Sequence, residues 1–392
     1  MRQPLTPVQL VNQPHTLHAC VQELARFDTL SFDIEFDNNS YGYGVTLCVV
    51  QVATPGACYV IDGLAGLDLA PLYMLFQDPR IQKIVHTPGE DLRLLHSLGC
   101  YPQNVYDTEV PARLLNYEHT SLATLLREKL GFEMSKTQQR SNWLRRPLTK
   151  AQVQYAADDV IWLHPLKAVL EAEAAEQGLV SFVQQEQELL NTTLYPVPAK
   201  NDFLRPADQY TLSPKEQYVV NALLRYRDEL ARNINRPPYQ VIREEFLREL
   251  AAGSRQPESI LQEAGIHPRF KNRRFSNGLQ NLLAQAKKEA ADQNLSAKKQ
   301  RVRNSTGPVG NPRKPPDDRE KIFVPVKQAL VQRFGVHAAT FLLSNRLVNE
   351  LLKGAITLQD LKPAYRQELI YEIAATNGID LSAYTSPPAS TA

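Results

Sequence analysis

The sequence predicts an α/β domain with a mixed sheet, followed by two small all-helical domains. Three observations support this prediction. The chain has 392 residues, more than one hydrophobic core usually serves. Up to residue 178 the apolar segments first have strand character and then alternate between strands and helices, as in α/β domains. From residue 213 onward the apolar pattern is helical, and a segment rich in proline and lysine interrupts it.

The first domain is predicted to span residues 1–200. Its elements are expected, in order, as strands at 30–36, 45–53 and 57–64, a helix at 69–77, a strand at 81–86 and a helix at 90–99. Thr87, Pro88 and Glu90 have the pattern of a capping box with proline at the first helical position, so we expect Thr87 to cap the last of these helices. A long helical run at 149–178 then begins at a threonine cap and ends at a glycine.

The two helical domains are predicted at 201–292 and 319–385, with a basic flexible linker at 293–318 between them. Ser213 and Pro214 begin the first long helix, as its cap and its first-turn proline. The remaining helices are expected at 237–252, 323–335, 337–354 and 361–378.

The net charge of +2 hides an asymmetry along the chain. Residues 267–321 contain 14 Lys and Arg against 5 Asp and Glu, so the rest of the chain has an excess of acids. A basic segment attached to an acidic body suggests a polyanion as partner of the segment and cations as ligands of the body. For residues 296–321 alone, a solvated linker explains the composition equally well.

Neither a membrane span nor disulfide chemistry is expected. No segment approaches the length and hydropathy of a membrane span, and the first residues lack the pattern of a signal peptide. Cys20, Cys48, Cys58 and Cys100 show no CxxC pairing and have apolar neighbours, so we interpret them as reduced core thiols rather than zinc ligands. These features predict a cytoplasmic protein without a membrane partner.

Three carboxylates lie within the apolar segment "SFDIEFD" at residues 31–37. Residues two apart on a strand share a face, so Asp33 and Glu35 project together while the apolar residues take the other side. Burying two neighbouring acids is costly unless something compensates their charge. Taken alone, however, a D-x-E pair on a strand is more often a solvated face than a reactive site.

Three further residues are eligible to join this pair. Asp91 falls in the first turn of a predicted helix, where interaction with the helix dipole is the simpler explanation, although sites in α/β domains assemble at such helix starts. Tyr155 and Asp159 lie four residues apart on the predicted helix at 149–178 and therefore share a face beside its apolar stripe. Packing is the usual role of a tyrosine there, and Asp158 competes with Asp159 for any acidic role.

In this order, D-x-E on the first strand, an aspartate at a helix start and Y-x-x-x-D on the last helix resemble the DEDD superfamily of 3′-to-5′ exonucleases, in its tyrosine subgroup. "HTPGEDL", "NWLRRPLT" and "YAADDV" resemble the ribonuclease D family within it, across essentially the whole α/β domain. "PPYQVIREEFLRELA" is similar to the first HRDC module (helicase and RNase D C-terminal) of that family, and "FLLSNRLVNELL" with "YRQELI" to the second. Asn142, where an acid is common, and Tyr365, where tryptophan is frequent, depart from the family pattern.

The resemblance implies a ribonuclease H-like mixed sheet with flanking helices, followed by two HRDC-type domains. It also implies that Asp33, Glu35, Asp91 and Asp159 hold two divalent cations, Mg²⁺ or Mn²⁺, for which oxygen ligands are suited. Cations at this place also remove the electrostatic objection to four clustered acids. Tyr155 would orient or deprotonate the attacking water.

Other polar residues are candidates for holding the substrate. They are Gln51, His86, Arg145, Arg146, Arg269, Lys271, Arg273 and Arg274. Surface solvation is the alternative for the glutamine and the first two arginines, and a structural role is an alternative for the histidine. The last four cations can neutralise phosphates, while the nearby Phe270 and Phe275 can stack on a base but more often pack inside.

These inferences lead us to expect a monomeric 3′-to-5′ exoribonuclease that releases nucleoside 5′-monophosphates and trims structured RNAs such as tRNA precursors. A DNA exonuclease of the repair type shares the ligand set and stays open as an alternative. A non-catalytic nucleic-acid-binding scaffold on a decayed nuclease fold is the alternative from another class. The presence of all four acids and the tyrosine disfavours it.

Overall fold

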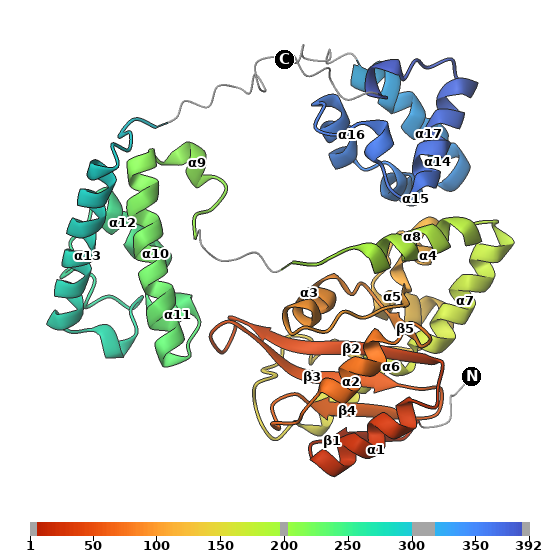
Figure 1. Ribbon diagram of the computed structural model, residues 1–392, viewed down its shortest axis with the longest axis horizontal. Helices are drawn as coiled ribbons and strands as arrows, with labels where there is room; N and C mark the ends of the chain where they lie inside the picture. Colours follow the sequence, from red (N-terminus) through yellow and green to blue (C-terminus); the bar gives the residue numbers. More distant parts are fainter. Residues whose placement is uncertain (1–5, 197–202, 300–317, 386–392) are drawn as a thin grey trace.

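The computed structural model describes residues 6–196, 203–299 and 318–385. These residues form an α/β domain and two helical regions (Figure 1). The predicted α/β domain with a mixed sheet is confirmed, and both regions behind it are helical. The domain boundaries stay predictions, and most of the predicted linker, residues 300–317, lies outside the described residues.

One mixed sheet of six strands forms the centre of the α/β domain, in the order β1-β4-β3-β2-β5-β6. β3 pairs antiparallel with β2 and β4, while the other neighbouring pairs are parallel. The strands are β1 (Val8–Val11), β2 (Thr29–Asn38), β3 (Val45–Ala53), β4 (Cys58–Asp62), β5 (Gln82–Val85) and β6 (Val105–Asp107). β2 therefore lies inside the sheet, between β3 and β5.

Helices cover both faces of this sheet. They are α1 (Pro14–Leu24), α2 (Ala70–Gln77), α3 (Gly89–Ser97), α4 (Glu109–Leu114), α5 (Leu122–Leu125) with the π-helical turn η1 (Leu126–Leu130), α6 (Lys150–Ile161), α7 (Leu163–Glu176) and α8 (Val180–Thr192). Phe32 and Ile34 of β2 pack with α1, α2 and α3 on one face. On the other face, α6 packs against β3 and β4, and the hydroxyl of Ser31 donates to the carbonyl of Val160. Because side chains alternate along β2, α6 lies over the face that carries Asp33 and Glu35.

Several predicted helices end or begin at other places than expected. The run at 149–178 is divided at Trp162 into α6 and α7, because Pro165 has no N–H to continue the helix. The predicted cap at Thr87 is wrong: α3 begins after Pro88, no side chain caps it, and Thr87 has a positive φ of 57°. The segments at 237–252 and 337–354 each form two helices, which meet at Ile242 and at Ser344.

The first helical region contains α9 (Asp208–Thr211), α10 (Pro214–Ile234), α11 (Pro238–Val241), α12 (Glu244–Ala252), the 3₁₀ turn η2 (Pro268–Phe270) and α13 (Arg273–Asp292). The predicted cap of α10 is confirmed, since the Ser213 side chain accepts from the backbone N–H of Glu216. The second helical region contains η3 (Arg319–Phe323), α14 (Val324–Phe334), α15 (Val336–Leu342), α16 (Asn345–Leu352), η4 (Leu358–Asp360), α17 (Ala364–Thr376) and η5 (Ser382–Tyr384). Within the described residues, no helix combines the length and hydropathy needed to span a membrane.

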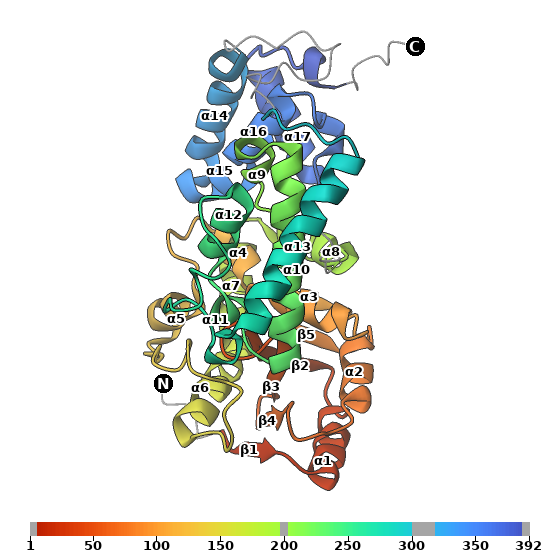
Figure 2. The same cartoon turned by 90° about the vertical axis from the view of Figure 1, so that its left-hand side faces the viewer.

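The second helical region packs directly on the α/β domain, with α15 beside α4 and α17 beside α8 (Figures 1 and 2). The ring of Tyr365 stacks on that of Phe182, with 4.3 Å between ring centroids, and its hydroxyl donates to Glu186. Glu186 also pairs with Arg366 at 2.7 Å, and both side chains are buried. Asn116 accepts hydrogen bonds from the first backbone N–H groups of α15. Tyr365 thus serves the contact between domains.

Candidate active site

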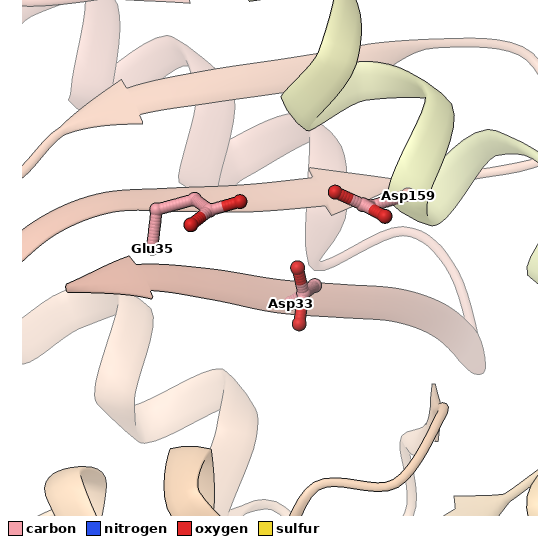
Figure 3. Close-up of side chains that lie close together, drawn as sticks. All are labelled: Asp33, Glu35 and Asp159. Carbon is pink, nitrogen blue, oxygen red and sulfur yellow. The ribbon is translucent and has the colours of Figure 1, made fainter. Parts of the chain in front are cut away.

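Three of the predicted acids converge on one point. Asp33 and Glu35 on β2 and Asp159 on α6 direct their carboxylates toward one another (Figure 3). One carboxylate oxygen of each lies within 4.8 Å of the other two. The convergence follows from the fold, because the two strand residues share the face over which α6 crosses.

Asp91 reaches the same place from another element. It lies in the first turn of α3, directly after β5, which pairs in parallel with β2. Asp91 does not belong to the group of three, but its carboxyl group hydrogen-bonds to that of Asp33. Asp33 therefore has Asp91 as a hydrogen-bond partner and lies within 4.8 Å of Glu35 and Asp159. The structure thus brings together all four acids that the sequence singled out.

Burial and mutual repulsion make ionisation of these acids unfavourable. Burial raises the pKa of Asp33 to about 6. Burial, together with the charges of Asp33, Asp159 and Asp91, raises the pKa of Glu35 to about 10. The pKa values of Asp91 and Asp159 are also raised, first by burial and then by the nearby charge of Asp33. Without a counter-charge, the cluster consequently holds protons at neutral pH.

The donor set fits divalent cations. All four side chains offer carboxylate oxygens, the hard ligands that Mg²⁺ and Mn²⁺ prefer, and imidazole or thiolate ligands are absent from the group that the described residues form. The raised pKa values indicate a site that lacks positive charge and that cations would complete. The cluster therefore offers a set of oxygen ligands suited to divalent cations.

Tyr155 lies one helical turn before Asp159 on α6 and borders the same site. Its ring packs against buried Trp143, with 6.1 Å between ring centroids. Burial, and then the charges of Asp159, Glu35 and Asp33, raise the pKa of its phenol. The phenol is therefore protonated at neutral pH, which favours orienting a water by hydrogen bonding over removing a proton from it.

Gln51 and Arg146 make hydrogen bonds to residues of β2 and β3, the strands beside the acids. Gln51 lies opposite Asp33 on β3, is fully buried, and its Nε2 donates to Asp33 Oδ2 at 2.7 Å. Next to Glu35, β3 has a bulge at Cys48, whose carbonyl accepts from Arg146 Nη2 at 2.8 Å. The Arg146 guanidinium also binds both carboxylate oxygens of Asp62. These contacts explain both residues without RNA, and their predicted substrate contacts stay untested.

The loop that leads to Asp91 depends on a residue that the sequence analysis missed. Asp107, at the end of β6, is buried and accepts from the backbone N–H of Thr87 at 2.9 Å and of Glu109 at 2.9 Å. A positive φ is rare for a β-branched residue such as Thr87, so this contact stabilises an unusual backbone conformation. An aspartate at the carboxyl end of a short strand was the signal that could have revealed it.

His86 precedes this loop and is neutral at physiological pH. Its Nδ1 lies 2.9 Å from the Thr108 hydroxyl, and burial lowers its pKa to about 4. Asn142 has a structural role, because its Oδ1 accepts from the backbone N–H of Leu144. Neither residue belongs to the group of three acids.

The remaining predicted substrate residues lie at the surface. Arg145, Arg269, Lys271, Arg273 and Arg274 are exposed, and the last four lie at η2 and the start of α13. Phe275 is buried in the core of the first helical region, and Phe270 packs on it with 5.2 Å between ring centroids. The packing interpretation of the phenylalanines is therefore confirmed, while the cations stay available to phosphates.

Comparison with known proteins gives a consistent result. A family model described as 3′-5′ exonuclease matches residues 8–175. Ribonuclease D of Acidiphilium cryptum is 30% identical over 282 residues, which cover 71% of this chain and 72% of that protein. Ribonuclease D of Desulfotalea psychrophila is 31% identical over 266 residues, which cover 65% and 70% of the two chains.

Two solved structures share the fold along nearly the whole chain. The crystal structure of Escherichia coli RNase D matches with a TM-score of 0.65 at 24% identity, covering 94% of this chain and 99% of that one. A protein from Bifidobacterium adolescentis matches with a TM-score of 0.71 at 21% identity, covering 95% and 96%. The helical regions therefore belong to the shared fold.

Proposed function

The chain belongs to the ribonuclease D family and is a 3′-to-5′ exoribonuclease, and we propose that Asp33, Glu35, Asp91 and Asp159 hold its two divalent cations. The observation that carries this proposal is the convergence of three of these carboxylates within 4.8 Å, with the fourth bonded to Asp33. Asp33 is close to the other three acids, so it would help to hold the cations. The alternative of a non-catalytic scaffold on a decayed nuclease fold requires the loss of at least one of these ligands. All four acids are present in this cluster.

Held by these four carboxylates, divalent cations would supply activation of a water for attack on the phosphodiester and stabilisation of the leaving 3′-oxygen. Tyr155 orients this water as a hydrogen-bond donor, since its phenol is protonated. Gln51 holds the side chain of Asp33 in place through its hydrogen bond. Hydrolysis in this way releases nucleoside 5′-monophosphates from the 3′ end of the RNA.

The finer features of the enzyme are also proposals. We propose structured RNAs, with tRNA precursors among them, as substrates, as the family resemblance implies. The helical regions at 201–292 and 319–385 are proposed as HRDC-type domains, which their sequence segments and all-helical content support. Their exposed cations Arg269, Lys271, Arg273 and Arg274 support an electrostatic role. A monomer in the cytoplasm completes the proposal, in keeping with the four buried, unpaired cysteines.

A comparison of labelled linear and circular substrates tests the activity. We expect linear RNA to shorten from its 3′ end in Mg²⁺, the circular form of the same RNA to resist, and a chelator to stop the reaction. Cleavage of the circle at a comparable rate indicates an endonuclease and contradicts the proposal. Linear DNA of the same sequence decides between the two exonuclease alternatives, because preferential degradation of DNA supports the repair type.

A further inference from the structure

A second polar pocket, of about 720 Å³, lies where the β2–β3 hairpin meets the first helical region. It is lined by Asn39 of the hairpin and by Arg205, Arg227, Tyr239, Arg243 and Glu244 of the helical region, among others. None of the four acids of the active site lines it. Figure 1 shows the hairpin extending from the sheet toward α11 and the end of α10.

Hydrogen bonds between the two parts hold the walls of this pocket together. The Tyr43 hydroxyl donates to Asp228 Oδ2 at 2.5 Å, and the Tyr43 N–H donates to Asn235 Oδ1 at 3.1 Å. The Tyr239 hydroxyl donates to the carbonyl of Ser40 at 3.0 Å. The pocket is therefore formed by two parts of the chain whose relative position is fixed by specific contacts.

Arg227 is an under-satisfied cation in this pocket. Its side chain is 12% exposed, and its Nε is buried without a hydrogen-bond partner. Its Nη2 lies 3.5 Å from Glu244, a carboxylate that also pairs with Arg205 at 2.9 Å and with Arg248 at 2.8 Å. One carboxylate thus serves three guanidinium groups. The shared carboxylate therefore leaves N–H donors of the Arg227 guanidinium from which a phosphate in the pocket can accept.

Two further arginines and Tyr239 suit a nucleotide unit rather than a simple ion, and the carboxylate of Glu245 also lines the pocket. Arg243 is exposed and has no ion-pair partner within the described residues, and Arg205 is 58% exposed. Guanidinium groups bind phosphate oxygens in pairs of parallel hydrogen bonds. Tyr239 is 56% exposed, and its ring offers an aromatic face on which a base can stack. Cations and an exposed ring at one pocket are typical of sites for single-stranded nucleic acid.

The pocket also lies along the strand that carries two of the catalytic acids. Asn39 follows Glu35 by four residues on β2 and its hairpin, and a strand rises about 3.3 Å per residue, so the two positions are separated by about 13 Å. A single strand whose 3′ end reaches Asp33 and Glu35 can therefore pass the pocket a few nucleotides upstream.

We propose that this pocket is a subsite for the RNA substrate, in which Arg227 and Arg243 bind a phosphodiester upstream of the 3′-terminal nucleotide and Tyr239 stacks on the adjoining base. The proposal rests on the proposed exoribonuclease function. It assigns the hairpin and the first helical region a role in gripping the RNA, while the chemistry stays at the four acids.

Binding measured in a chelator tests the subsite without catalysis. The probes are a labelled single-stranded RNA oligonucleotide and a dinucleotide, which is too short to span both sites. We expect Arg243→Gln to weaken binding of the oligonucleotide by about tenfold, to leave the dinucleotide unchanged, and to lower the slope of log affinity against log salt by about 0.7. Lys287→Gln on α13 removes an exposed charge that does not line the pocket, and we expect it to change binding by less than about twofold.

A second variant tests the buried cation. Arg227→Lys keeps the charge but loses the planar fork, so we expect the same selective loss with an unchanged melting temperature. In Mg²⁺ both variants should raise KM for the oligonucleotide and leave kcat unchanged. The proposal is overturned if a variant affects both probes equally or affects neither. It is also overturned if inorganic phosphate displaces the oligonucleotide whatever the length of that oligonucleotide. An active Asp33→Asn variant, by contrast, contradicts the proposed metal site and leaves the chelator measurements intact.

Discussion

Gln51 Nε2 lies 2.7 Å from Asp33 Oδ2, and the two residues face each other across β2 and β3. Gln51 is fully buried, and its Oε1 has no partner. A buried amide in this position orients the carboxylate of Asp33, which lies close to the other three acids. The glutamine that the sequence suggested as a substrate contact is therefore placed to act on the proposed metal site through Asp33.

The first prediction follows from this contact. Replacing Gln51 by Leu removes the donor to Asp33, so we expect the Mn²⁺ concentration that gives half-maximal activity to rise about 10–100-fold, with little change in KM for RNA at saturating metal. Gln51→Glu places a fourth carboxylate next to Asp33, after Glu35, Asp91 and Asp159, and should weaken metal binding further. If both variants instead raise KM for RNA at an unchanged metal requirement, Gln51 contacts the substrate.

The second prediction concerns the acids themselves. Asp33→Asn and Asp159→Asn each remove a ligand charge from the cluster, so turnover should fall by at least about 10³-fold in either variant. In chelator their melting temperatures should equal or exceed that of the parent protein, because repulsion within the cluster is relieved. Substantial activity in both variants, measured on preparations free of host nucleases, contradicts the assignment.

A third prediction is that the metal-free protein loses stability as pH rises. The pKa of Asp33 is raised to about 6 and that of Glu35 to about 10, while both titrate near 4 in an unfolded chain. At low pH both states are protonated. As pH rises from about 4 to about 10, the unfolded chain releases protons that the folded cluster retains, so the free energy of unfolding falls.

Melting temperatures in chelator at about pH 5 and about pH 8 check this sign. Asp33→Asn provides the control for titrating groups outside the cluster and also lowers the repulsion on Glu35, so we expect the parent protein to lose more stability between the two pH values than this variant does. Mg²⁺ should reverse the loss, since cations stabilise the ionised cluster. A parent protein that gains stability relative to the variant as pH rises contradicts the raised pKa values.

The fourth prediction asks whether the contact of Asp107 with the loop before Asp91 only stabilises the fold or also affects catalysis. Asp107→Ala leaves the N–H of Thr87 without its carboxylate acceptor, so we expect a loss of about 1–3 kcal/mol in stability together with a clearly lower kcat. Asp107→Asn keeps an oxygen acceptor and should retain most of both. Melting temperature and kcat measured on the two variants decide the matter. A normal kcat in Asp107→Ala makes the contact purely structural.

The features of the fold that the sequence predicts are those set by interactions between residues close together in the chain. The strand at 45–53 agrees with β3, because a continuous apolar run needs no distant partner to be recognised. The caps at Ser213 and Thr149 are local as well, since each oxygen binds a backbone N–H three residues ahead. β1 and β6 escaped prediction because runs of four and three residues carry too little periodicity.

The four acids could be recognised because a shared strand face, a helix start and an i,i+4 pair each have a local signature. Their supporting contacts have none. The pairing of Gln51 with Asp33 depends on the register of β2 and β3, which a bulge at Cys48 shifts. The contact of Asp107 with Thr87 requires two parallel strands to lie side by side. Such contacts are set by tertiary structure and cannot be read from neighbouring residues.

The last prediction concerns Tyr155. A purely structural role predicts that Tyr155→Phe, which loses one hydroxyl beside the ring that packs on Trp143, lowers stability and changes the rate little. A role in orienting the water predicts unchanged stability and RNA affinity but a turnover number lower by roughly 10²–10⁴-fold. We expect the second outcome, since the Tyr155 ring borders the acids and the raised pKa keeps its proton available for a hydrogen bond. Measurements of melting temperature, binding to uncleavable RNA and single-turnover rate on one preparation distinguish the two.

The metal dependence of Tyr155→Phe should stay as in the parent protein, because Asp159 keeps its position on α6. An unimpaired rate in this variant leaves Tyr155 as a packing residue.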